Sequence, residues 1–315
     1  MIVDATLLLG VLLAVLTGLY VFRDQEREEL TDVVRKSVKG GSFIKLQDGF
    51  VHYDIAGPVD GPVVVLVHGF STWSFTWDAT FQVLVDAGFR VLRYDLYGRG
   101  YSDRPAVVYD KDLFDRQLFG LLAVLDTHDR VDLVGNSMGG LITTTFAARH
   151  PDKVRTLTLI DPAFFFLERV PFPLEIPLIG DCAGRVLAVP FVAKAQTKDF
   201  KHPERFSKYD RTYRLQMRYK GFSRAILSTI RSFPSWNAVE DLKRVSRTNT
   251  TPVLLVWGRE DRTVPLAVSE KVRVIAPRAE FHVIDDAAHM PHYERPEIVN
   301  PVIIRFLRTM KEDNR

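Results

Sequence analysis

Short apolar runs alternate with longer segments of helical periodicity along most of this 315-residue chain. Strands are predicted at residues 42–47, 51–55, 63–67, 90–95, 131–135, 154–161, 252–257 and 280–284. Helices are predicted between and after them, at residues 77–87, 112–126, 138–150, 264–276 and 296–310. Continuously apolar strands are typical of burial on both faces of a sheet. The alternation therefore predicts an α/β fold, with a mostly parallel central sheet and helices on both faces.

One stretch breaks this alternation. Between Pro162 and Thr250 no run reads convincingly as a strand, and several prolines precede two helical patterns at residues 204–219 and 223–233. We therefore expect a helical insertion that lies over the sheet.

The first 22 residues differ from the rest of the chain. Residues 5–22 are 18 consecutive residues without a charge, enough for about 27 Å of helix, at the short end of the spanning range. The run ends in bulky residues rather than in a small-residue cleavage site, which favours an uncleaved membrane anchor over a signal peptide. Lys and Arg follow the run but do not precede it, so the main domain is expected in the cytoplasm. An apolar helix packed on the protein itself is the alternative.

Residues 23–41 read as a polar connector that ends at Gly40 and Gly41. Charges of both signs surround Leu30, Val33 and Val34, which have near-helical spacing. This pattern fits an amphipathic helix on a membrane surface, and it fits equally a short helix docked on the main domain.

Composition excludes several classes of protein. The formal net charge is only +3, whereas nucleic-acid binders of this size usually carry a stronger basic excess. Cys182 is the single cysteine, so neither an intrachain disulfide nor a cysteine-built zinc site can form. We expect no cofactor, no metal and no nucleic-acid partner.

The strongest functional signal is the sequence Gly135-Asn136-Ser137-Met138-Gly139. It follows a predicted buried strand and opens a predicted helix, which is the context that a G-x-S-x-G nucleophile turn requires. Ser137 would occupy a sharp, strained turn, so Gly135 and Gly139 supply the small neighbours that such a turn needs. We predict that Ser137 is a nucleophile.

A serine nucleophile needs a general base and an orienting acid, expected here in the chain order Ser, Asp, His. Asp261 lies just beyond the strand predicted at residues 252–257, and His289 lies just beyond the one predicted at 280–284. Both positions fall at the carboxyl edge of a parallel sheet, where open α/β sheets place their sites. Glu260 is the rival acid and His292 the rival base.

Acyl transfer at Ser137 would also need an oxyanion hole made of two backbone N–H groups. The residue after the nucleophile, Met138, is expected to supply one of them. The loop after the strand at residues 63–67 reads His68-Gly69-Phe70-Ser71, and Phe70 N–H is the candidate for the other.

Taken together, five blocks resemble the α/β-hydrolase superfamily over residues 43–307. They are H-G-F-S at 68–71, D-L-Y-G-R-G-Y-S at 95–102, G-N-S-M-G-G at 135–140, G-R-E-D at 258–261, and the late His289. The resemblance implies a triad of Ser137, Asp261 and His289. It also implies a core of residues 42–162 and 248–315, a helical cap of residues 163–247, and a loop at 95–102 that braces the site.

Within the superfamily, the chain resembles membrane-anchored carboxylesterases and monoacylglycerol lipases. The expected activity is hydrolysis of lipophilic or acylglycerol-like carboxylic esters through an acyl-enzyme, with the N-terminal helix in contact with membrane lipid. The cap holds nine of the 21 phenylalanines, which suits an apolar pocket, although a helical layer also needs a core of its own.

Two other functions stay open. The G-N-S-M-G-G turn is similar to that of C–C hydrolases that act on meta-cleavage products. Those enzymes usually carry a second glycine where this chain has Ser71, and a tryptophan where it has Met290. A hydrolase-fold protein that binds a ligand without turning it over is the third possibility.

Overall fold

The computed structural model describes residues 26–312, except residues 126, 128–129, 177 and 249. The hydrophobic helix predicted at residues 1–22 therefore lies outside the described residues. Within the described part of the chain, no helix combines the length and the apolar character needed to cross a bilayer.

Eight strands form one sheet in the order β1-β2-β4-β3-β5-β6-β7-β8. They are β1 (Ser42–Lys45), β2 (Phe50–Ala56), β3 (Val63–Val67), β4 (Arg90–Tyr94), β5 (Val131–Asn136), β6 (Val154–Ile160), β7 (Val253–Gly258) and β8 (Glu280–Ile284). The hairpin β1-β2 and the pair β2-β4 are antiparallel, and the other pairs are parallel. The predicted mostly parallel sheet is thus confirmed.

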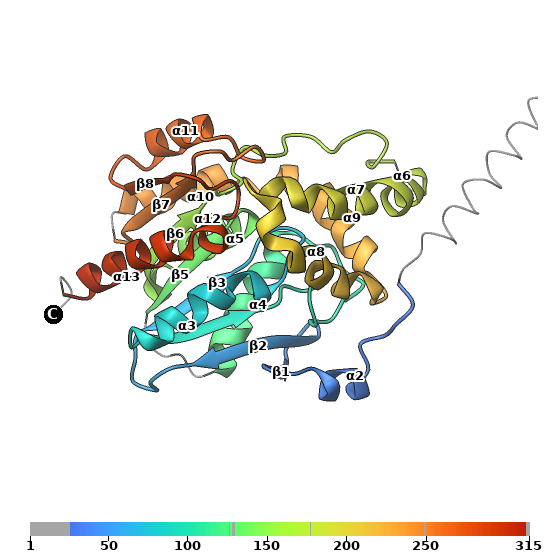
Figure 1. Cartoon of the computed structure of the whole chain (residues 1–315), viewed down its shortest axis with the longest axis horizontal. Coiled ribbons are helices and arrows are strands. Elements are labelled where there is room, and N and C mark those ends of the chain that lie inside the picture. The colour runs from blue at the N-terminus through green and yellow to red at the C-terminus, as the bar shows by residue number, and fades with distance from the viewer. Residues whose placement is uncertain (1–25, 126, 128–129, 177, 249, 313–315) are drawn as a thin grey trace, which may run out of the picture.

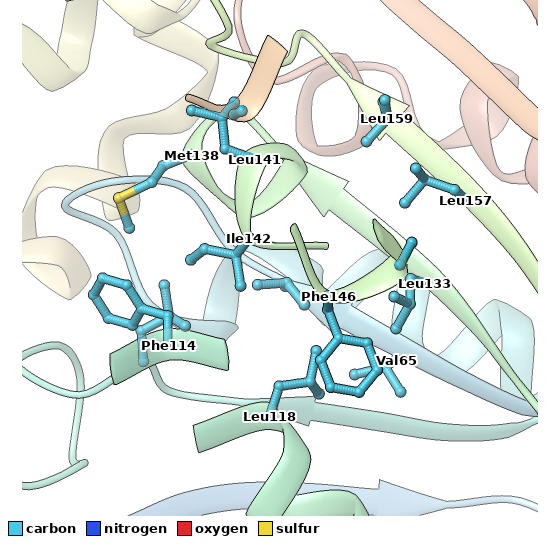
Figure 2. Packing of buried hydrophobic residues seen from close by; sticks show 14 of the residues in the cluster. Val65, Phe114, Leu118, Leu133, Met138, Leu141, Ile142, Phe146, Leu157 and Leu159 are labelled. Carbon is cyan, nitrogen blue, oxygen red and sulfur yellow. The ribbon is translucent and has the colours of Figure 1, made fainter. Parts of the chain in front are cut away.

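Helices cover both faces of this sheet (Figure 1). On one face lie α3 (Asp78–Asp86) and α13 (Pro296–Glu312), and on the other lie α4 (Lys111–Val124), α5 (Met138–Arg149), α10 (Ala238–Thr248) and α11 (Ala267–Ile275). Figure 2 shows the second face, where Met138, Ile142 and Phe146 of α5 pack between α4 and the sheet. Because α5 is buried along almost its whole length, the turn that precedes it is held rigidly.

The insertion between β6 and β7 contains no strand among its described residues. Its helices are α6 (Ile179–Ala183), α7 (Val189–Ala195), α8 (Ser207–Arg214) and α9 (Phe222–Ser232), followed by α10. Tyr209, Tyr213 and Ile226 form a small core with Phe75 and Met290 of the sheet domain. Leu242 of α10 joins the main core beside α5.

The described part of the connector lies against the protein. Glu28 forms a parallel bridge with Tyr219, and the Glu26 carboxylate accepts hydrogen bonds of 2.6 Å from both the Gly221 and the Ser223 N–H. The short helix α2 (Asp32–Ser37) has no buried residue, but its Arg35 pairs with Asp103 at 2.6 Å. Of the two expectations for this helix, these contacts fit docking on the main domain.

Candidate active site

Ser137 occupies a strained turn between β5 and α5. Its backbone has φ 54° and ψ −119°, a conformation that non-glycine residues adopt only where the surroundings impose it. A Cβ atom on Gly135 would lie 2.4 Å from the Gly139 carbonyl oxygen, and one on Gly139 would lie 2.2 Å from that of Val67. Both glycines of the motif are therefore required by close packing, and the turn presents Ser137 at the carboxyl end of the central strands.

The structure brings Ser137, His289 and Asp261 into one hydrogen-bonded chain. The Ser137 Oγ lies 2.9 Å from His289 Nε2, and His289 Nδ1 lies 2.8 Å from Asp261 Oδ2. The other carboxylate oxygen, Oδ1, accepts from the N–H groups of Thr263 at 2.7 Å and Val264 at 2.9 Å. Since a carboxylate can only accept, the imidazole hydrogen sits on Nδ1, and Nε2 is free to take the serine proton.

The two rival residues lie elsewhere. Glu260 pairs with Lys201 at 2.5 Å. The His292 ring packs against Trp77 at 4.1 Å between ring centroids, and burial lowers the His292 pKa to about 3, so this imidazole stays neutral. Neither side chain makes a hydrogen bond to Ser137 or His289.

The loop expected to form the oxyanion hole is held in place by hydrogen bonds to its backbone carbonyls. Three consecutive carbonyl groups each accept a hydrogen bond from a side chain. The pairs are His68 Nδ1 to Gly69 at 2.8 Å, Arg99 Nε to Phe70 at 2.8 Å, and Gln216 Nε2 to Ser71 at 2.7 Å. Burial lowers the His68 pKa to about 4, so its imidazole is neutral and its other nitrogen accepts from Leu96 N–H.

These bonds also orient the Phe70 N–H. In a trans peptide the carbonyl and the following N–H point in opposite directions, so the anchored Gly69 carbonyl turns the Phe70 N–H away from His68. Gly69, Phe70, Ser137 and Met138 all line one cavity. Met138 is the first residue of α5, where a helix has no acceptor of its own for the N–H. Both candidate donors thus belong to residues that line the same cavity as Ser137.

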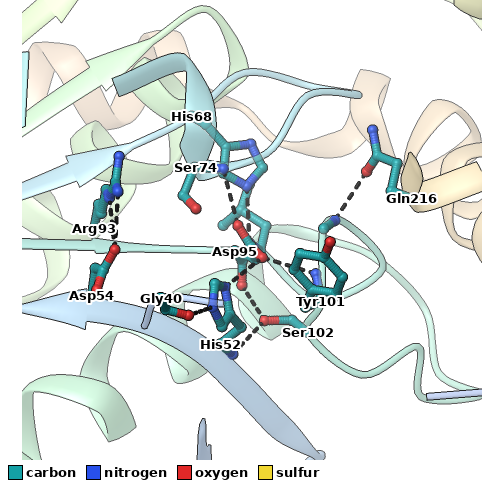
Figure 3. A network of polar contacts seen from close by, with 12 residues as sticks. Gly40, His52, Asp54, His68, Ser74, Arg93, Asp95, Tyr101, Ser102 and Gln216 are labelled. Carbon is teal, nitrogen blue, oxygen red and sulfur yellow. Dashed lines mark hydrogen bonds and ion pairs between the residues drawn. The ribbon is translucent and has the colours of Figure 1, made fainter. Parts of the chain in front are cut away.

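The loop at residues 95–102 surrounds a buried carboxylate, shown in Figure 3. Asp95 accepts from the N–H of Ser74 at 2.9 Å and of Tyr101 at 2.8 Å, and from His52 Nδ1 at 2.9 Å. Its pKa is held below the usual range because the opposing effects of His52, His68 and the Tyr101 N–H outweigh burial. This network ties β2 and the loop after β4 to the segment that begins at Ser74, just after the oxyanion loop.

A second buried carboxyl, Asp161, lies beside the triad. It directly follows β6, has φ 44°, and accepts from the Gly258 N–H at 2.9 Å. Burial and the neighbouring Asp261 charge raise its pKa well above the ordinary value, which favours the neutral form of Asp161. Asp161 is the last residue of the strand predicted at 154–161, but no motif marks it as a functional residue.

Asp161, Asp261 and His289 also have metal-ligand spacing, with potential donor atoms within 4.8 Å of one another. Both nitrogens of His289 already face hydrogen-bond partners, Asp261 and Ser137. The arrangement therefore fits proton transfer better than coordination of a cation.

The charges around His289 predict how kcat/KM depends on pH. Burial opposes the charged imidazolium, but Asp261, with a contribution from Asp199, outweighs burial and raises the His289 pKa above its ordinary value of about 6.5. A base must be neutral to accept a proton, so kcat/KM should fall as the pH drops through a midpoint above about 6.5. A pH–rate profile tests this, with enzyme preincubated at each pH and returned to pH 8 as the stability control. A midpoint well below 6.5 would contradict the assignment.

Next to these groups is a cavity of about 560 Å³. Ser137 and His289 lie in its wall, together with Phe166, Leu174 and Phe233 from the insertion. Its lining is mainly apolar, so the site suits a substrate with a lipophilic portion.

A nucleophile turn, a base and an acid at the carboxyl edge of such a sheet define a hydrolase of the α/β class. The family model described as the alpha/beta hydrolase family matches residues 64–302. The chain therefore belongs to the alpha/beta hydrolase family.

Similar proteins carry several activities. The chain is 29% identical to a 2-hydroxy-6-oxononadienedioate/2-hydroxy-6-oxononatrienedioate hydrolase of Paraburkholderia phymatum, over 86% of this chain and 93% of that protein. Among solved structures, a thermophilic esterase from Thermogutta terrifontis is 25% identical, with a TM-score of 0.69, over 85% of this chain and 99% of that one. A membrane phospholipase A, described as a bacterial virulence factor, is 25% identical, with a TM-score of 0.67, over 97% of both chains.

Proposed function

We propose that this protein hydrolyses lipophilic carboxylic esters of the acylglycerol type, with Ser137 as nucleophile. The observation that carries the proposal is the chain Ser137–His289–Asp261 opening into a mainly apolar cavity. The similarity to an esterase and to a membrane phospholipase A supports it.

The geometry supports acyl transfer in two steps. His289 Nε2 takes the Ser137 proton while Oγ attacks the ester carbonyl, and the N–H groups of Phe70 and Met138 stabilise the oxyanion. The carbon–oxygen bond to the alcohol then breaks, and the leaving oxygen takes the proton from Nε2. Water next gives a proton to His289 and attacks the acyl carbon. The bond from this carbon to Ser137 Oγ then breaks, Oγ takes the proton back from His289, and the acid is released.

Carbon–carbon bond hydrolysis is the second candidate. The relative in Paraburkholderia phymatum acts on dicarboxylate substrates, and Lys198 and Arg262 line the cavity here. Both cations are exposed rather than buried, whereas the lining of the cavity is mainly apolar. This distribution favours an ester substrate over a dicarboxylate. A pure ligand-binding role is disfavoured because the hydrogen-bonded triad is complete.

A p-nitrophenyl ester series from acetate to palmitate tests the proposal on the full chain in detergent. We expect activity that depends on Ser137, with a chain-length optimum set by the cavity. Turnover of a 2-hydroxy-6-oxo-dienedioate with no turnover of any ester would establish the second candidate instead. Folded protein that is inert toward both substrate classes would indicate ligand binding.

We further propose that residues 1–22 anchor the protein in a membrane, with the catalytic domain in the cytoplasm. The uncharged run and the basic residues that follow it support this, as does the similarity of almost the whole chain to a membrane phospholipase A.

Deletion of residues 1–22 is expected to lower hydrolysis of a lipid ester embedded in vesicles by at least about tenfold, because the loss of the anchor removes local concentration at the surface. Turnover of a water-soluble p-nitrophenyl ester should stay unchanged and serves as the internal control. Equal activity of both proteins on the vesicles would refute the anchor.

A further inference from the structure

We propose that Asp199 recognises a hydroxyl group on the alcohol portion of the substrate, so that glycerol-type esters are preferred over simple alkyl esters. This inference rests on the proposed ester hydrolysis and names the residue that would select the alcohol. Asp199 belongs to neither the triad nor the oxyanion loop, and its sequence context shows no motif.

The position of Asp199 is fixed on two sides. Its backbone carbonyl accepts the His289 N–H at 3.0 Å, and its Oδ1 accepts from the Thr263 hydroxyl at 2.8 Å. Thr263 also donates its N–H to Asp261, so the insertion is joined here to both the acid loop and the base loop. Asp199 is therefore held beside His289 rather than free to turn toward solvent.

Asp199 lines the same cavity as Ser137 and His289. Only Oδ1 has a hydrogen-bond partner among the described residues. A carboxyl in a mainly apolar cavity is stabilised when its remaining oxygen is also hydrogen-bonded. A hydroxyl group on the bound substrate would supply that bond.

The reaction itself indicates which half of the substrate Asp199 meets. The leaving oxygen must take its proton from His289 Nε2, so the alcohol portion lies on the side of His289. Since Asp199 is anchored to the His289 backbone, it faces the alcohol rather than the acyl chain. Apolar residues such as Phe166, Leu174 and Phe233 are left to line the acyl chain.

Asp199 could act in another way, by stabilising the charged imidazole. Its charge contributes to raising the His289 pKa, and an effect through His289 would change the turnover of every ester alike. Recognition of a hydroxyl would change only esters that carry one. The two roles are separated by the ratio of kcat/KM for an ester that carries a hydroxyl group to kcat/KM for an ester that lacks one. Measured on one preparation, this ratio does not depend on the fraction of active enzyme.

The test compares 1-monooctanoylglycerol with propyl octanoate, which shares the acid and the three-carbon alcohol but lacks hydroxyl groups. Full-length protein in detergent is used, as wild type, Asp199→Leu and Asp199→Asn. A hydrogen bond to a charged group corresponds to about a 10- to 100-fold effect. We expect the glyceryl-to-propyl ratio to fall by that factor in Asp199→Leu, and by less in Asp199→Asn, since the amide keeps an acceptor.

Asp210→Asn is the matched control, because it makes the same change at an exposed acid of α8 that pairs with Arg214. Its ratio should equal that of the wild type. Equal losses on both esters in the Asp199 variants would overturn the inference in favour of an electrostatic role, and an unchanged ratio would overturn it outright. Absence of Ser137-dependent turnover of both octanoate esters would instead refute the ester-hydrolase proposal, so the two failures are distinguishable.

Discussion

Replacement of Ser137 by alanine should lower kcat on every ester by about 10⁴- to 10⁶-fold, because the variant lacks the oxygen on which the proposed acyl-enzyme forms. The fold should survive. Serine and alanine both carry a Cβ, so the strain at φ 54° is unchanged. Among the described residues, the only side-chain hydrogen bond lost is the one to His289. The Tm of the variant should therefore stay within a few degrees of the wild type.

Two measurements sharpen this prediction. Ser37→Ala makes the same substitution at an exposed serine of α2 whose hydroxyl bonds only to the Val34 carbonyl, and it should keep full activity. A fluorophosphonate probe should label the wild type and Ser37→Ala but not Ser137→Ala. Ester turnover by folded Ser137→Ala at more than about 1% of wild type would mean that another residue attacks the carbonyl.

The sheet and the three triad positions could be predicted because local sequence encodes them. Buried parallel strands are apolar along most or all of their length, as β3 is throughout, and parallel strands end at a common edge. Asp261 and His289 could therefore be placed together from their positions after two predicted strands, although they are 28 residues apart.

The residues that complete the site could not be found in the same way. Gln216 and Asp199 come from the insertion, and each acts through a contact that depends on how that layer sits on the sheet. Neither lies at the end of a strand or in a recognisable motif. The burial of α10 against α5 could not be predicted from sequence either. The spacing of apolar residues in α10 fits a helix of the insertion and a helix on the sheet equally well.

Asp161 and Asp261 lie close together beside His289. Asp261 is expected to orient His289 as a carboxylate, whereas Asp161 is expected to be neutral, and two isosteric variants can test this difference. In Asp261, Oδ1 accepts two backbone N–H groups, so an amide at this position must turn its oxygen toward them. Its NH₂ group would then face His289 Nδ1 and require that nitrogen to accept. The imidazole hydrogen would move to Nε2, where it blocks transfer of the Ser137 proton. Asp261→Asn should therefore lower kcat by about 10⁴-fold.

Asp161→Asn should behave differently, because burial and the neighbouring Asp261 carboxylate raise the pKa of Asp161 and so favour its neutral form. An amide oxygen can still accept the Gly258 N–H, and the side chain keeps its size and lack of charge. We expect kcat within about fivefold of wild type, measured on the same p-nitrophenyl ester and with Tm as the control for folding. A loss comparable to that of Asp261→Asn would mean that the negative charge resides on Asp161. The two carboxyls would then share the role of orienting His289, since like charges this close cannot both ionise freely.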